Sequence, residues 1–195
     1  MEQLVTRVRN GDHKAFRELY ELFSKPMYNL CLRMTGNADD AHDVLQDSFV
    51  KVFEHIGQLK QPATLPAWIK RICTNTAILA LNQRKKLQFE ELDGQTGLFN
   101  RHEEEGWIRK LELEQDLAAI NEAIRQLPDR YRVVFTMHVL EDYTHEEIAG
   151  MLGIVAGTSR SQYLRAKQKL MDILKKNKNH VRPVETIPAA IQIQA

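Results

Sequence analysis

Apolar side chains recur at the spacing of an α-helix along most of this 195-residue chain. After Asp12, the residues Ala15, Phe16, Leu19 and Phe23 fall on one face, because residues three and four apart lie on the same side of a helix. No segment alternates apolar and polar residues over the length that a half-buried strand needs. The sequence therefore predicts an all-α fold.

Residues that begin or end helices divide the first half of the chain. Pro26 suits the first turn of a new helix, and Gly36 is a typical helix end. Asn37 is a favourable N-cap for a third helix, which Gly57 would close. A fourth helix is expected over residues 66–84. The first half thus predicts a helical bundle.

The net charge of +1 conceals blocks of opposite sign. Residues 55–89 contain no acid but several Lys and Arg, whereas residues 90–116 contain nine acids. Like charges gather where a partner or water neutralises them, which indicates anion-binding surfaces separated by a flexible, solvated linker. The predicted organisation is a first domain, an acidic linker, a second helical domain and a disordered tail, at residues 1–88, 89–112, 113–176 and 177–195 respectively.

The two cysteines, Cys31 and Cys73, each lie in an apolar helical pattern. This favours buried free thiols over a disulfide. No His stands near them at the spacing of a zinc site, and we expect no metal and no cofactor. The N-terminal residues lack the features of a signal peptide, and no apolar run has membrane-spanning length. We expect a cytoplasmic protein without membrane insertion.

Residues 143–170 carry the pattern of a helix-turn-helix. Thr144 and Glu147 have the spacing of a capping box, which would begin the first of two helices. Gly153 suits the sharp turn between them, because a glycine adopts positive φ without strain. The second helix is expected to bury one stripe of side chains: Ser159, Tyr163, Ala166 and Leu170.

The rest of this second helix is expected to face outward. No acidic residue occurs from Ile148 to Met171, so the outward surface is polar and basic. Such a helix can enter the major groove of DNA, where Arg contacts guanine and Ser or Thr contacts phosphate or base. A solvated basic helix without a partner is the other interpretation. The candidate DNA-binding residues are Thr158, Arg160, Ser161, Gln162, Arg165 and Lys169.

Longer segments of the chain together resemble one known family. The segment LPDRYRVVFTMHVLEDYTHEEIAGMLGIVAGTSRSQYLRAKQKL is similar to the promoter-binding domain of bacterial extracytoplasmic-function (ECF) sigma factors. In the first half, GDHKAFRELYELF, NADDAHDVLQDSFVKVFEHI and LPAWIKRICTNTAILALNQRKK resemble the three successive motifs of that family's first domain. The resemblance covers residues 5–88 and 113–175. It implies a sigma factor that binds the β′ and β subunits of the RNA polymerase core enzyme and recognises the −10 and −35 promoter elements.

The resemblance assigns the helix at residues 38–56 to a coiled coil of the polymerase β′ subunit. Acids near a helix N-terminus also complement the helix dipole, but Asp47 lies two turns further in and needs another explanation. The residues implied in polymerase binding are Asp39, Asp40, Asp43, Gln46 and Asp47.

The resemblance also implies that the loop and helix at residues 58–86 bind and open the −10 element. This role needs cations for phosphates and a polar or stacking pocket for an extruded base. Trp68 could stack on a base, but its position on the apolar side favours a core role. The residues Thr64-Leu65-Pro66 stand where the family often has an aromatic. The implied −10 contacts are Lys60, Gln61, Lys70, Arg71, Asn75, Arg84 and Lys85.

The sequence departs from the family's pattern at several positions. Val155 and Ala156 replace a more polar pair before the second helix, and Ser159 replaces a customary valine, whose lost packing is expected to loosen the helix-turn-helix slightly. The central region of larger sigma factors is missing, and in the family the linker in its place threads near the polymerase's active-site channel. The family also implies an anti-sigma factor as a partner.

Two other functions are compatible with parts of the sequence. A helix-turn-helix also occurs in stand-alone transcriptional regulators, which need no polymerase. His138, Glu141 and His145 could share a helix face and hold the metal ion of a small hydrolase. Position 149 is Ala, however, where a zincin helix beginning at His145 has its second His. We expect a sigma factor without catalytic residues rather than an enzyme.

Overall fold

The computed structural model describes residues 1–84, 87 and 117–180, and every regular element within these ranges is helical. The all-α prediction is confirmed. The predicted linker at residues 89–112 and most of the predicted tail lie outside the described residues. The last helix continues to His180, so the first residues of the predicted tail are helical. No helix in the described ranges is long and apolar enough to cross a bilayer.

The first group of helices is the bundle that the sequence predicts, with one addition at its N-terminus. Asp12 and Asn37 accept hydrogen bonds from backbone N–H groups of the first turns that follow them, as good N-caps do. The elements are α1 (Glu2–Arg9), α2 (His13–Thr35), α3 (Ala38–His55), η1 (Ile56–Gln58), η2 (Pro62–Thr64) and α4 (Leu65–Gln83).

The helix break expected at Pro26 is wrong. Pro26 lies inside α2, which runs without interruption from His13 to Thr35. A proline removes one backbone hydrogen bond from a helix. The long apolar face of α2 packs against both α3 and α4, and this packing outweighs the local cost.

The second group of helices contains the predicted helix-turn-helix. A largely buried segment precedes it, formed by α7 and the π-helical turn η3. The elements are α6 (Leu117–Arg125), α7 (Asp129–Phe135), η3 (Thr136–Leu140), α8 (His145–Leu152) and α9 (Ala156–His180). We call α1–α4 the first unit and α6–α9 the second unit.

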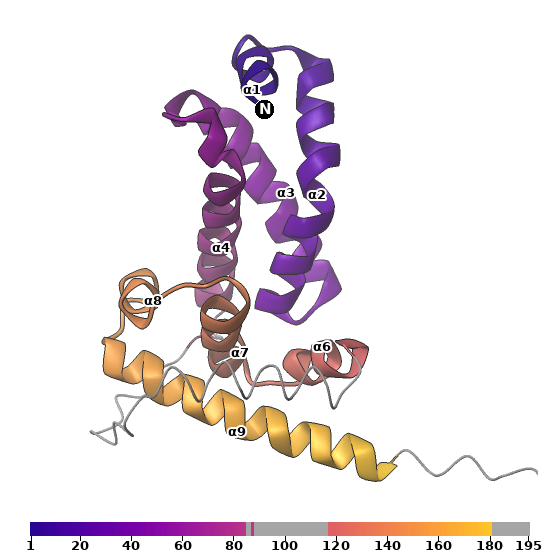
Figure 1. Ribbon diagram of the computed structural model, residues 1–195, viewed down its shortest axis with the longest axis vertical. Coiled ribbons are helices and arrows are strands. Elements are labelled where there is room, and N and C mark those ends of the chain that lie inside the picture. The colour runs from indigo at the N-terminus through magenta and orange to yellow at the C-terminus, as the bar shows by residue number, and fades with distance from the viewer. Residues whose placement is uncertain (85–86, 88–116, 181–195) are drawn as a thin grey trace, which may run out of the picture.

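Helices α2, α3 and α4 pack side by side, and the second unit lies across one end of this bundle (Figure 1). The core of the bundle contains Leu19, Leu30 and Ile69, each fully buried. Cys31 and Cys73 are buried free thiols, as expected. Trp68 is half-buried and packs against the core, which agrees with a packing role.

The two units meet at the C-terminal end of α2, where α7 contacts it. Gly36 ends α2 with a φ of 72°, and this left-handed conformation favours a residue without a Cβ at the position. The guanidinium of Arg132 from α7 fills the space beside it, and a Cβ at position 36 would lie 2.6 Å from Arg132 Cζ. Gly36 thus serves both the turn and the contact between the units.

We predict that Gly36→Ala destabilises the protein more than Gly11→Ala, measured by chemical denaturation of the full chain. Gly11 has a φ of 78° but no atom within 4 Å of an added Cβ, so it reports the backbone strain alone, about 1 kcal/mol. Gly36→Ala also displaces a buried guanidinium from its acceptors, for a total of about 3 kcal/mol. Equal losses in the two variants would contradict the close packing of Arg132.

Candidate nucleic-acid interface

The helix-turn-helix is held by the capping box that the sequence predicts. The backbone N–H of Thr144 donates to Glu147 Oε2 at 2.8 Å, and the Glu147 N–H donates to Thr144 Oγ1 at 3.2 Å. Gly153 then turns the chain with a φ of 69°. These local features fix how α9 leaves α8 and therefore which side of α9 is open.

The buried side of α9 is wider than the sequence predicts. Tyr163, Ala166 and Leu170 are fully buried as expected, and so is Ser159. Thr158 and Gln162, which were expected to face outward, are 6% and 0% exposed. They lie one turn apart on the edge of the buried stripe, so their outward placement is wrong.

The open side of α9 carries a mixture of charged, polar and apolar side chains. Arg165 and Lys169 are exposed, while Arg160 is partly exposed and its guanidinium bonds to Glu146 of α8. Leu164, which the sequence interpretation did not select, is 39% exposed on the same side. Its position, three residues after Ser161 and off the buried stripe, is a signal that could have identified it.

A histidine pair links α8 to the rest of the second unit. The rings of His138 and His145 stack with centroids 4.1 Å apart, and both rings contact Tyr163. His145 Nδ1 lies 2.8 Å from Ser159 Oγ, in a buried hydrogen bond. The serine that replaces a customary valine therefore has a buried polar partner.

The environment of His145 disfavours its charged form. Burial, together with the charges of His138 and Arg160, lowers the pKa of His145 to about 4. Glu141, the third residue of the metal-site hypothesis, instead contacts Arg33 and Lys70 of the first unit. Within residues 1–84 and 117–180, no group of three metal-ligating side chains is brought together.

The acidic face expected on α3 is present on the surface of the first unit. Asp39, Asp43, Gln46 and Asp47 are exposed, whereas the side chain of Asp40 is only 14% exposed. Asp40 is largely covered because Arg84, at the end of α4, forms an ion pair with it.

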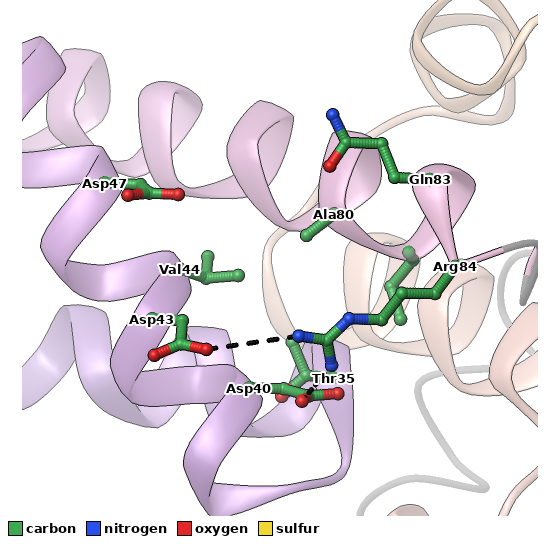
Figure 2. A pocket seen from close by; sticks show the side chains of 9 residues that line it. Thr35, Asp40, Asp43, Val44, Asp47, Ala80, Gln83 and Arg84 are labelled. Atoms are coloured by element: carbon green, nitrogen blue, oxygen red, sulfur yellow. Dashed lines mark hydrogen bonds and ion pairs between the residues drawn. The ribbon is translucent and has the colours of Figure 1, made fainter.

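A pocket of about 160 Å³ lies between this face and the end of α4. Figure 2 shows the guanidinium of Arg84 between Asp40 and Asp43, with Arg84 Nη2 4.0 Å from Asp43 Oδ2. The hydrogen bond and charge of Asp40 raise the pKa of Arg84. Two residues expected to bind different partners, Asp40 and Arg84, therefore bind each other in the isolated chain.

The residues expected to contact −10 DNA are distributed along one loop and α4. Lys60, Gln61, Arg71 and Asn75 are exposed. Lys70 is partly buried, and its Nζ lies 3.5 Å from Glu141 Oε2. Lys85 lies outside the described residues.

The loop that carries Lys60 and Gln61 is held by a residue that the sequence interpretation missed. Arg9 of α1 donates to the backbone carbonyls of Ile56, the first residue of η1, and Leu59, the residue that follows η1. A single arginine in an N-terminal helix gives no sequence signal for such a contact, because its acceptors are backbone groups about 50 residues away.

Comparison with known proteins identifies both units. Residues 19–87 match the family model "Sigma-70 region 2", and residues 117–170 match "Sigma-70, region 4". The chain is 27% identical to the ECF RNA polymerase sigma factor SigW of Bacillus subtilis, over 87% of this chain and 94% of the relative. It is 31% identical to the ECF RNA polymerase sigma factor SigE of Mycolicibacterium smegmatis, over 86% of this chain and 65% of the relative.

The chain belongs to the ECF family of RNA polymerase sigma factors. A sigma factor directs the initiation of transcription. A solved structure of the sigma factor RpoE from Bartonella quintana, in complex with the anti-sigma factor NepR, has the same fold, with a TM-score of 0.52 at 19% identity over 83% of this chain and 98% of that one. The region 2 match distinguishes this sigma factor from a stand-alone helix-turn-helix regulator.

We predict that the free energy of unfolding of this sigma factor falls as the pH is lowered from about 6.5 to 4. Above this range His145 is neutral in both the folded and the unfolded chain. Within the range, the imidazole of His145 binds a proton mainly in the unfolded chain, because its pKa in the folded chain is about 4. The expected loss is about 3 kcal/mol, measured by urea denaturation at several pH values.

His145→Gln should flatten this pH dependence, since the amide can still hydrogen-bond near Ser159 but does not titrate. His55→Gln, at an exposed position in the last turn of α3, is the matched control and should leave the slope unchanged. A slope that persists in His145→Gln would contradict the assignment to this histidine.

Proposed function

We propose that this ECF sigma factor divides promoter binding between its two units, with α3 contacting the polymerase core. The exposed side chains carry the proposal: acids on α3, cations and amides on α4 and its preceding loop, and cations on α9. The acidic surface of α3 is complementary to a basic protein surface. The basic surfaces of α4 with its preceding loop and of α9 are complementary to nucleic acid. Transcription in vitro with core polymerase on a promoter library tests the proposal as a whole.

The second unit would bind the −35 duplex through the open side of α9. Arg165 and Arg160 suit guanine edges, Ser161 suits phosphate or base, and Leu164 suits the methyl group of thymine. Lys169 lies further along the helix, where a phosphate contact is expected. Thr158 and Gln162 are buried and are left out of this surface.

The first unit would bind and open the −10 element. Lys60 and Gln61 are presented by the loop that Arg9 holds, and Arg71 and Asn75 follow on α4. The residues that we propose to contact −10 DNA also include Lys70, Arg84 and Lys85. Cations of this kind hold the backbone of a separated strand, while polar loop residues contact an extruded base.

The remaining assignments concern the organisation of the chain and its setting. We assign residues 1–88 and 113–176 to the two domains, residues 89–112 to a linker and residues 177–195 to a tail. The protein would act in the cytoplasm with the polymerase, without a cofactor and without catalytic residues of its own. The similarity to a sigma factor solved with NepR supports an anti-sigma factor as a further partner.

We predict that changing both Asp43 and Asp47 to Lys weakens binding to core polymerase at least about tenfold, because like charges then face a basic partner. Both aspartates are exposed, so the fold should persist, which circular dichroism would verify. The control changes Glu2 and Glu21, exposed acids of α1 and α2, to Lys. Equal loss in the control would indicate a general charge effect and remove the assignment of α3.

We predict that Arg165→Ala costs about 1–3 kcal/mol on the preferred −35 duplex and much less on a scrambled one, because it loses a base contact. Lys169→Ala should weaken binding to both duplexes alike and lower the salt slope by about one. Holoenzyme affinities over a salt series provide the measurement. If Arg165→Ala lowers the affinity for both duplexes by the same factor, Arg165 contacts only the DNA backbone.

A further inference from the structure

Helix α1 packs against the loop between α3 and α4. It lies outside the segment that matches Sigma-70 region 2, which begins at residue 19. Its apolar face is buried in the core of the first unit, where Leu4, Val5 and Val8 are at most 7% exposed. Helix α1 contacts both η1 and η2, the short turns before and after Lys60, at the end of the bundle opposite the second unit (Figure 1). The N-terminal helix is therefore part of the structure that supports this loop.

Arg9, the last residue of α1, holds two backbone carbonyls of the loop. Its Nε donates to the Ile56 carbonyl at 3.3 Å, and its Nη2 donates to the Leu59 carbonyl. The Leu59 N–H also donates to the Ile56 carbonyl, at 3.3 Å. A guanidinium is planar and its N–H groups point in fixed directions, so these bonds fix the orientation of the loop backbone relative to α1.

Two buried leucines and a turn fix the rest of the loop. Leu59 is 4% exposed and Leu65 is fully buried, so the backbone is anchored at both ends. Between them, the N–H and the hydroxyl of Thr64 both donate to the Gln61 carbonyl, at 3.0 and 2.8 Å. Lys60 and Gln61 themselves are exposed. The loop therefore presents these two residues from a backbone that is already ordered.

An ordered loop has a specific consequence for the binding of an extruded base. Hydrogen bonds to the edge of a base require a donor and an acceptor at defined positions, whereas contact with a phosphate mainly requires positive charge. Ordering a loop at the moment of binding also costs conformational entropy, which a loop held in advance has already lost. A loop held by Arg9 is therefore suited to discriminate among bases as well as to hold the DNA backbone.

We propose that α1 is part of the −10 recognition site and that Arg9 is a positioning residue, which fixes the loop so that Gln61 selects one base. The side-chain amide of Gln61 supplies both a donor and an acceptor, as recognition of a base edge requires. The inference rests on the proposed −10-binding function of this loop. Arg9 acts through the two carbonyls and makes no base contact of its own.

The first experiment measures the loop itself, in the full chain without DNA or polymerase. Arg9→Lys retains the positive charge but lacks the planar fork that holds both carbonyls. Hydrogen exchange of the Leu59 and Thr64 N–H groups, followed by NMR, should be faster in this variant than in the parent protein. Arg17→Lys, at an exposed position of α2, is the matched control and should exchange like the parent. Parent-like exchange in both variants would overturn the positioning role of Arg9.

The second experiment measures base selection by the holoenzyme. The DNA is a promoter fragment in which one −10 strand is unpaired and carries each of the four bases in turn at each position. Gln61→Ala should abolish the preference at one position, which identifies the base that the loop contacts. Arg9→Lys should lower the preference at that position at least about fivefold, the lower end of what one good base contact contributes, and leave the other positions unchanged. Arg17→Lys should retain the preference of the parent at every position.

A salt series distinguishes positioning from a direct contact between Arg9 and a DNA phosphate. A positioning role predicts that Arg9→Lys keeps the salt slope of the parent while its base preference falls. The opposite pattern is an unchanged base preference in Arg9→Lys, with a salt slope that falls by about one in Arg9→Gln. That result would identify a phosphate contact and overturn the inference.

Gln61→Ala also separates failure of this inference from failure of the proposed function. If Gln61→Ala leaves the base preference unchanged at every position, the loop does not read a base, and the proposed function of the loop fails together with this inference. If Gln61→Ala removes a preference that Arg9→Lys retains, the loop keeps its function and only the role of Arg9 is wrong. Arg9 and Gln61 are both exposed, so the variants should retain the fold, which circular dichroism would verify.

Discussion

The contact of Arg132 with the end of α2 determines how the two units of this sigma factor are arranged. The guanidinium is buried and hydrogen-bonds to the carbonyls of Met34 and Thr35, so α7 must lie across the end of the bundle. A buried guanidinium without such acceptors would be costly, which gives this contact a single favourable geometry. Gly36 makes the contact possible, since any Cβ there would meet the guanidinium. The place of η3, and hence of Glu141 beside Lys70, follows from it.

Several residues assigned to external partners pair with carboxylates of the chain itself. Arg84 pairs with Asp40, Arg160 with Glu146, and Lys70 with Glu141. Each of the first two pairs has an exposed member, Arg84 in one and Glu146 in the other. Ion pairs at the protein surface contribute only about 0–1 kcal/mol, so a partner can exchange them at little cost. The binding surfaces of the free sigma factor are therefore partly neutralised without being permanently blocked.

The helix-turn-helix shows how a departure from a family's pattern can be accommodated. Ser159 at a fully buried position would leave its hydroxyl without a partner in an apolar core, which is unfavourable. Here the hydroxyl bonds to His145, whose ring stacks on that of His138. Burial keeps His145 neutral near pH 7, so the core of this domain contains a polar contact that depends on pH.

The sequence by itself determined the features that depend on neighbours within a few residues: the N-caps Asp12 and Asn37, the capping box of α8 and the turn at Gly153. The tertiary structure alone decided the continuity of α2 through Pro26, the burial of Gln162 and the partners of Lys70 and Arg132. Caps and turns are local hydrogen bonds, so their residues stand close together in the sequence. The Arg33–Glu141 pair joins residues 108 positions apart, and only the packing of whole helices brings such charges together.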